Sequence, residues 1–165
     1  MIDAISLKIL KILQKKARIP NVEVARQVKL APSAVLERIR KLEKQGIIDG
    51  YEVRLNPKQF RCSQVAFITV ITDCTQEAQR VGTRLSALPE IQEVHFVSGE
   101  DGYLVKARVS DSAELGRLIQ TKIAPIKAVR STRTAIVMAT IKETARIPID
   151  AMEQPAQQGE KDAKD

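Results

Sequence analysis

The chain has little of what metal sites and catalytic centres are built from. His95 is its only histidine, and Cys62 and Cys74 are its only cysteines. A single histidine excludes multi-histidine metal sites and paired Cys-His repeats, so we predict neither a metal nor another cofactor. His95 lies between Val94 and Phe96, where we expect a half-buried strand residue rather than a ligand.

Other signatures of enzymes are missing as well. The sequence has no glycine-rich phosphate loop followed by Lys-Ser or Lys-Thr, and neither cysteine has the surroundings of a catalytic nucleophile. Glu100 and Asp101 are adjacent acids, which indicates a solvated turn more than an acid/base pair. We therefore predict that the protein is not an enzyme.

Long apolar runs are also absent. No stretch approaches the roughly 20 apolar residues that a membrane-spanning helix needs, and the N-terminus alternates lysine with isoleucine and leucine, unlike a signal peptide. We predict no membrane association. Two unpaired thiols fit the reducing cytoplasm better than a Cys62–Cys74 disulfide does.

Charge is distributed unevenly along the chain. Residues 1–64 carry 14 basic and 6 acidic side chains, whereas residues 65–165 carry 13 and 14. A basic segment joined to a neutral one predicts a polyanionic partner for the basic segment and a boundary near residue 60.

The clearest helix signal begins at Pro32 and ends before Gly46. Proline suits a first helical position, and glycine suits the left-handed residue after the last turn. Val35, Ile39 and Leu42 recur at helical spacing and predict one buried stripe. The opposite side is mostly basic and carries Ser33, Glu37, Arg40, Lys41 and Lys44. Such a face is typical of a helix in a DNA major groove, although an ordinary solvated helix has the same pattern.

Two shorter helices precede it. Asp3 is a candidate N-cap for a helix to about Lys16, and Pro20 and Asn21 begin a second helix that runs to about Val28. With a turn at residues 29–31, the segments predict a helix-turn-helix unit in which the last helix is the recognition helix.

The second half alternates strands with helices. We expect a strand at residues 47–55 and a polar connection to residue 64. Strands follow at 65–72, 91–97, 103–109 and 131–141, with helices at 75–88 and from 112 to about 125. The order βαββαβ is that of a ferredoxin-like sandwich, with both helices on one face of an antiparallel sheet. The fold class is therefore α+β.

The other face of the sheet needs a cover. We assign to it the apolar residues Phe67, Val70, Ile71, Ile136 and Met138. A second copy of the chain is the simplest cover, so we predict a homodimer. The predicted domains are residues 1–47 (helix-turn-helix), 48–64 (linker strand and connection) and 65–150 (ferredoxin-like), followed by a disordered tail at 151–165.

These segments together resemble the Lrp/AsnC (leucine-responsive, feast/famine) transcriptional regulators over residues 2–149. The resemblance rests on Arg-Ile-Arg-Lys-Leu-Glu at 38–43, Gly-Ile-Ile-Asp-Gly-Tyr at 46–51, Val-Ser-Gly-Glu at 97–100, Tyr-Leu-Val-Lys at 103–106 and the segment 129–137. Three positions depart from the family pattern: Lys29 in the turn, Ala31 as the cap of the recognition helix, and Gly102 in an aspartate position.

The resemblance implies a DNA-binding regulator that pairs through its C-terminal domain, assembles dimers into tetramers or octamers, and binds an amino-acid effector between dimers. It also implies that the strand after the recognition helix pairs with the same strand of the partner subunit. An effector-independent architectural DNA-binding protein is the alternative. An enzyme built on a ferredoxin-like domain is disfavoured.

Candidate DNA contacts lie at the start and along the exposed side of the recognition helix. Ser33, Ala34 and Glu37 are placed to approach base edges of double-stranded DNA, because the N-terminal half of the helix enters the groove. Phosphate contacts are expected from basic side chains. The predicted interface comprises Pro32, Ser33, Ala34, Glu37, Arg38, Arg40 and Lys41.

Candidate effector contacts lie in two places. The hairpin at 98–102 offers backbone N–H groups and glycines that allow close approach, and hydroxyls on the last strand are expected to orient a zwitterion. The predicted site comprises Ser98, Gly99, Glu100, Asp101, Gly102, Ser131, Thr132 and Thr134.

Overall fold

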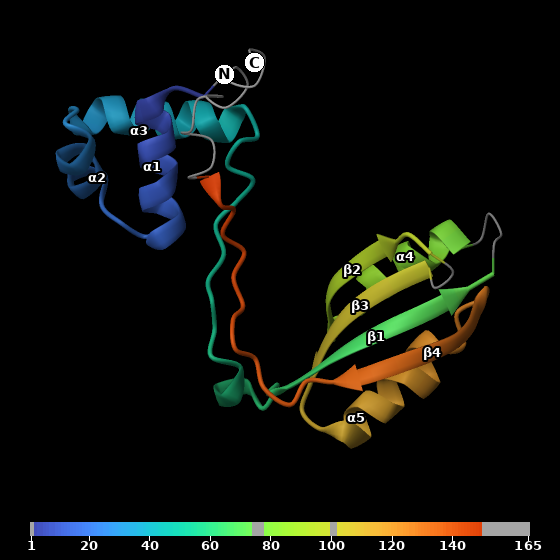
Figure 1. Ribbon diagram of the computed structural model, residues 1–165. Helices are drawn as coiled ribbons and strands as arrows, with labels where there is room; N and C mark the ends of the chain where they lie inside the picture. The colour runs from blue at the N-terminus through green and yellow to red at the C-terminus, as the bar shows by residue number, and fades with distance from the viewer. Residues whose placement is uncertain (1, 74–77, 100–101, 150–165) are drawn as a thin grey trace, which may run out of the picture. The chain divides into compact units, whose positions relative to one another are not determined.

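The computed structural model describes residues 2–73, 78–99 and 102–149, which belong to two compact units (Figure 1). One unit, called here the helical unit, combines residues 2–53 with residues 143–149. The other, the sheet unit, is Arg54–Lys142. The α+β fold class, with a helix-turn-helix unit and a βαββαβ unit, is confirmed.

The helical unit contains α1 (Ala4–Lys15), α2 (Asn21–Val28) and α3 (Pro32–Lys44), close to their predicted bounds. Asp3 caps α1, because its carboxylate accepts a hydrogen bond from the Ser6 N–H at 2.8 Å. The inward stripes of the helices form one apolar core, which consists of Ile9, Leu13, Val24, Ala25, Val35 and Ile39. This core holds α3 with its other side exposed.

The turn before α3 contains Lys29 in a left-handed conformation, with φ 57° and ψ 46°. This conformation costs a non-glycine residue about 1–2 kcal/mol. Two features of the next residue oppose that cost: the Leu30 N–H donates to the Ala25 carbonyl at 3.0 Å, and the Leu30 side chain packs on the core. Lys29 therefore holds a backbone geometry that glycine adopts more readily.

The strand predicted at residues 47–55 is absent, and this prediction was wrong for the single chain: residues 47–56 contain no helix or strand. A strand needs a neighbour that pairs with its N–H and C=O groups, and Val53 is 84% exposed. One side-chain hydrogen bond of this segment is made to the preceding helix. The Tyr51 hydroxyl donates to Glu43 on α3 at 2.9 Å. Partial burial, together with this bond, raises the pKa of Tyr51 to about 12.

Residues 143–149 follow the last strand but belong to the helical unit. The Ile147 N–H donates to Gln14 Oε1 at 2.8 Å, and Gln14 Nε2 donates to the Ile147 carbonyl at 3.3 Å. A single glutamine amide on α1 thus pairs with both backbone groups of Ile147. The sequence division had grouped these residues with the ferredoxin-like domain.

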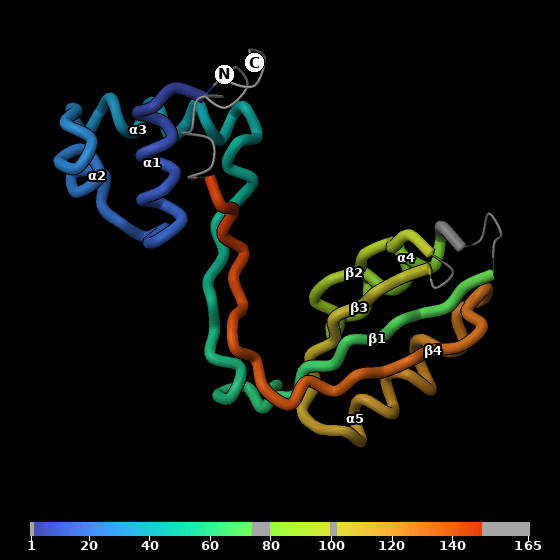
Figure 2. The backbone as a smooth tube through the Cα atoms, in the orientation of Figure 1, coloured from blue at the N-terminus to red at the C-terminus, as the bar shows by residue number. Residues whose placement is uncertain are grey.

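The sheet unit opens with a short 3₁₀ turn and then alternates strands and helices. Its elements are η1 (Pro57–Phe60), β1 (Gln64–Thr72), α4 (Ala78–Ser86), β2 (Ile91–Val97), β3 (Gly102–Val109), α5 (Ser112–Arg117), η2 (Leu118–Ile123) and β4 (Val129–Ile136). The strands are antiparallel in the order β2-β3-β1-β4 (Figure 2). The beginning of the helix predicted at 75–88 and the tail at 151–165 lie outside the described residues.

Both helices pack on the same face of the sheet. Its core combines Ala66, Ile68, Val70, Val105 and Ala107 from the strands with Val81, Leu85, Leu115, Leu118 and Ile123 from the helical segments. Val70 is fully buried there, so its assignment to the uncovered face was wrong. Alternation along a strand places Val70 with Ile68, and Phe67 and Ile71 on the opposite face.

The uncovered side is called here the open face. The strand register assigns to it Phe67, Thr69, Ile71, Glu93, His95, Val97, Leu104, Lys106, Ser131, Arg133 and Ala135. Two further residues predicted for this face are not part of it. Ile136 pairs with Ala66 and shares the helix side, and Met138 follows the strand.

The last strand ends five residues earlier than predicted, at Ile136 rather than residue 141. The Val137 N–H still donates to the Val65 carbonyl at 2.9 Å. Because β1 begins at Gln64, the chain beyond Val137 has almost no strand left to pair with. The end of β4 is therefore determined by where its partner strand β1 begins, not by the residues of β4.

The second helix of the sheet unit changes type halfway. The segment Leu118–Ile123 is a π-helix, with the Ala124 N–H donating to the Ile119 carbonyl at 2.8 Å. The sequence predicted a helix from residue 112 to about 125 and did not indicate this change of type. Bonds between residues five apart widen the turn, and Leu118 and Ile123, also five apart, are both buried.

Candidate nucleic-acid interface and effector site

The recognition helix α3 has the two faces that its sequence predicts. Val35, Ile39 and Leu42 are at most 7% exposed and lie inward. The opposite side is exposed and carries Ser33, Glu37, Arg40, Lys41 and Lys44. Ala34 is half-buried beside the stripe. The first half of the helix therefore presents polar and small side chains, and the second half presents cations.

The ends of α3 are closed in different ways. Ala31 supplies no side-chain cap, and Pro32 occupies the first turn. At the other end Gly46 has φ 66°, and its N–H donates to the Glu43 carbonyl at 2.9 Å. N–H groups in a first helical turn have no intrahelical partner, so the uncapped start of α3 retains donors suited to an anion.

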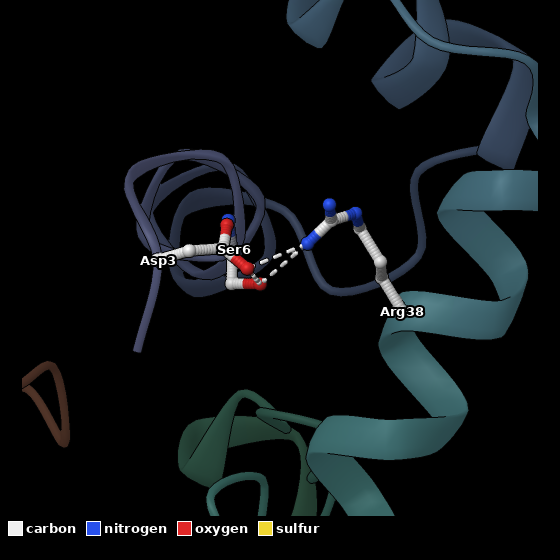
Figure 3. Close-up of polar contacts among 3 residues, drawn as sticks. All are labelled: Asp3, Ser6 and Arg38. Carbon is white, nitrogen blue, oxygen red and sulfur yellow. Dashed lines mark hydrogen bonds and ion pairs between the residues drawn. The ribbon is translucent and has the colours of Figure 1, made fainter. Parts of the chain in front are cut away.

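Arg38 is tied inside the helical unit (Figure 3). Its Nη1 donates to Asp3 Oδ2 at 2.7 Å and to Ser6 Oγ at 3.3 Å. These bonds join α3 to the capped start of α1. The Ser6 N–H and then the Arg38 guanidinium lower the pKa of Asp3 to about 2, which keeps this carboxylate ionised.

The other predicted phosphate contacts differ from Arg38. Within the described residues, the side chains of Arg40 and Lys41 make no hydrogen bond or ion pair. They retain a full set of donors for an external anion. Sequence reasoning predicted Asp3 as an N-cap but missed Asp3 and Ser6 as residues that position Arg38.

The effector hairpin is described in part. Ser98 and Gly99 are exposed, and Gly99 has φ 121°. Glu100 and Asp101 lie outside the described residues. Gly102 is buried with φ 98°, and a Cβ at this position would come within 2.7 Å of Thr72 Oγ1. Both the positive φ and this close approach favour glycine here, independently of any ligand.

The hydroxyls of β4 do not converge. Thr132 and Thr134 pair with Val70 and Ile68 and share the helix side of the sheet, whereas Ser131 pairs with Ile71 and lies on the open face. Thr132 is half-buried, and the other two are exposed. Within one chain, Ser131 and Thr132 cannot contact the same small ligand from the same side.

The open face contains a polar group at β2 and β3. Lys106 Nζ donates to Glu93 Oε1 at 2.9 Å, and His95 Nε2 lies 3.4 Å from Glu93 Oε2. Lys106, and to a lesser extent His95, lower the pKa of Glu93. The His95 side chain is 58% exposed, more than the half-burial predicted, because nothing in the described sheet unit covers this face.

The described residues contain neither a candidate metal site nor a candidate membrane-spanning helix. Its titratable side chains include no group of three or more that could hold a metal ion. No helix in residues 2–73, 78–99 and 102–149 is long and apolar enough to cross a membrane.

Two family models match the chain. A winged helix-turn-helix DNA-binding model matches residues 2–49, and an Lrp/AsnC ligand binding domain model matches residues 65–147. Together they cover both units of the structure.

Curated relatives match over most of their length. The leucine-responsive regulatory proteins of Haemophilus influenzae and Escherichia coli K12 are both 39% identical to this chain. The first match covers 87% of each protein, and the second covers 90% of this chain and 92% of the relative.

Solved structures agree with this result. A Neisseria meningitidis transcriptional regulator in complex with L-Met superimposes with a TM-score of 0.87 at 27% identity, covering 92% of this chain and 99% of that one. The AsnC structure of E. coli gives 0.81 at 26% identity, with 88% and 98% covered.

Proposed function

The chain belongs to the Lrp/AsnC family of DNA-binding transcriptional regulators. From that premise we propose that α3 binds duplex DNA, with base contacts from its first half and phosphate contacts from its second half. Ser33, Ala34 and Glu37 approach base edges, while Arg40 and Lys41 bind phosphates. Arg38 has a different role: its ion pair with Asp3 fixes the angle between α3 and α1.

The observation that carries this proposal is the exposed face of α3, mounted on a buried stripe in the segment that holds the excess of basic residues. Selection of binding sites from random duplex DNA tests it. We expect a pseudo-palindromic consensus, because a two-fold dimer presents two recognition helices. A Glu37→Ala variant should change the selected bases, whereas Lys41→Ala should weaken all sites alike. Recovery of the same consensus with both variants would remove the base-reading role.

We propose further that the sheet unit binds an amino-acid effector that changes DNA binding. The ligand-binding-domain match and the L-Met complex of the Neisseria relative support this proposal. Calorimetric titration with the amino-acid set, followed by DNA binding with and without each ligand, tests it. If no amino acid binds, the protein is an effector-independent regulator.

Variants of two β4 hydroxyls test which face of the sheet binds the effector. Because Ser131 and Thr132 face opposite sides of the sheet, Ser131→Ala and Thr132→Val should not both weaken binding through contacts with one chain. We expect one of the two to reduce effector affinity and the other to leave it unchanged. Equal losses in both variants would require a site built from two chains.

The assembly is proposed to be a homodimer joined through the open face, with dimers associating into tetramers or octamers. Phe67 is 38% exposed on this face, and the register places Ile71 and Leu104 on the same face. A second copy would remove these apolar side chains from water. We also propose that the protein is cytoplasmic. Its proposed partner is double-stranded DNA, and we propose no catalytic activity. Sedimentation at micromolar concentration tests the assembly, and a monomer would contradict it.

A further inference from the structure

Residues 143–149 are attached to α1 through the side chain of Gln14. Its Oε1 accepts a hydrogen bond from the Ile147 N–H at 2.8 Å, and its Nε2 donates to the Ile147 carbonyl at 3.3 Å. A primary amide carries an acceptor and a donor side by side. Gln14 therefore pairs with Ile147 as a residue of a neighbouring antiparallel strand would, but from the side of a helix.

The attached segment is also ordered by local hydrogen bonds. The Arg146 N–H donates to Thr144 Oγ1 at 3.1 Å, and the Ile149 N–H donates to the Ile147 carbonyl at 2.9 Å. Pro148 has no N–H to satisfy, and its ring fixes φ. The segment therefore has a defined conformation that the Gln14 amide can recognise.

The attachment depends on the backbone of Ile147 and not on its side chain. Ile147 is 70% exposed, so burial of this apolar side chain does not explain why the chain returns to α1. Gln14 is half-buried, and its amide supplies two hydrogen bonds that do explain the return. Substitutions of the Ile147 side chain and of its N–H group should therefore have different consequences.

This attachment gives the helical unit a second connection to the sheet unit. The chain leaves the helical unit after Val53 and re-enters it at Glu143. The first connection includes residues from 47 to 56, which contain no helix or strand. A unit joined by one such segment can rotate about the single bonds of that segment, whereas a second attachment removes much of this freedom.

We propose that Gln14 is a positioning residue for DNA recognition. By fixing residues 143–149 on α1, it restricts the orientation of the helical unit and thereby sets the separation of the two recognition helices in a dimer. Two linked binding units gain affinity for a paired site when the second unit is already held near its half-site. This inference rests on the proposed dimer and on the proposed binding of α3 to DNA.

Duplexes that carry two selected half-sites at different separations test the proposal, with the full chain and fluorescence anisotropy. For the wild type we expect one preferred separation. An insertion of about five base pairs should weaken binding about tenfold, because half a helical turn moves the second half-site to the other side of the duplex. A duplex with one half-site measures the DNA contacts of a single helical unit.

Gln14→Met removes both hydrogen bonds and retains the length and helix propensity of the side chain. The freed helical unit should weaken binding to the preferred duplex about fivefold and reduce the penalty of the insertion to about threefold. Binding to the single half-site should equal that of the wild type. The Ile147 amide should exchange its hydrogen faster in this variant than in the wild type, because its acceptor is lost.

Three control variants isolate the two hydrogen bonds. Ile147→Pro removes the N–H and should reproduce Gln14→Met, and the double variant should be no worse than either, because both changes remove one interaction. Ile147→Ala keeps the backbone groups and should behave as the wild type. Gln27→Met makes the same substitution at an exposed glutamine of α2 and should not change the dependence on separation.

Three results would overturn the proposal, and they differ in what else they remove. If Gln14→Met keeps the wild-type dependence on separation, Gln14 does not position the helical unit, and the proposed DNA contacts and dimer are unaffected. If this variant also loses binding to the single half-site, Gln14 stabilises the helical unit and has no separate positioning role. If the wild type itself has no preferred separation, the proposed two-fold arrangement fails together with this inference.

Discussion

Replacing Arg40 by alanine removes one cation from the exposed face of α3 without touching the buried stripe. Its guanidinium has no partner within the described residues, so no internal bond is lost and the fold should be unaffected. Each phosphate neutralised by a protein contributes about −0.9 to the slope of log affinity against log salt concentration. We therefore expect the magnitude of the slope to fall by about one for each subunit's contact.

The size of this effect can be measured directly. When salt rises from 50 to 200 mM, the fold-loss of DNA affinity should be smaller for a variant lacking one phosphate contact than for the wild type, by a factor of about 3.5. Fluorescence anisotropy with a selected site and a scrambled duplex should show the same change for both, because phosphate contacts carry no sequence information.

A matched variant removes the same charge elsewhere. Lys58→Ala alters an exposed lysine in η1 of the sheet unit and should leave the slope unchanged. If Arg40→Ala retains the wild-type slope, or if Lys58→Ala reduces it equally, Arg40 does not contact a phosphate and the docking of α3 proposed here is wrong.

Three further variants probe stability and assembly. Asp3→Asn should lower the melting temperature at pH 7, followed by circular dichroism. Because the pKa of Asp3 is lowered to about 2, its contribution is complete above the ordinary carboxyl pKa near 4 and is lost as the pH falls towards 2, where the two proteins should melt alike. Gly82→Ala should destabilise the sheet unit in urea, because its Cβ would lie 2.7 Å from Tyr103 Cε1. Gly116→Ala meets nothing within 4 Å and should gain about 0.5–1 kcal/mol; equal behaviour of the two would contradict this packing. Phe67→Glu places a charge on the open face and should convert a dimer to monomers in sedimentation, whereas a dimer that persists would exclude this face from the assembly.

The parts of the fold that sequence predicted best are those with local causes. The start and end of α3 follow from Pro32 and Gly46, because a fixed φ and a left-handed residue act on their own backbone. The cap at Asp3 is equally local. The buried stripe of α3 needed only helical periodicity, and so the candidate DNA face was available from the sequence alone.

The parts that sequence missed depend on partners distant in the chain. Strand propensity at residues 47–55 is real, but the segment pairs with no other strand in the single chain. The end of β4 at Ile136 is fixed by where β1 begins. The ion pair between Arg38 and Asp3 joins residues 35 positions apart, so charge patterning alone could not predict it.

At the candidate effector site, the sequence itself determines which hydroxyls of β4 share a face. Ser131 and Thr132 are neighbours in a strand, and neighbouring strand residues point to opposite faces. The register confirms this, since they pair with Ile71 and Val70 on opposite sides of the sheet. A zwitterion held by both hydroxyls therefore needs one of them from another subunit. The effector proposal and the assembly proposal are consequently linked: a contact with both residues is possible only if dimers or larger assemblies bring a second chain to the sheet.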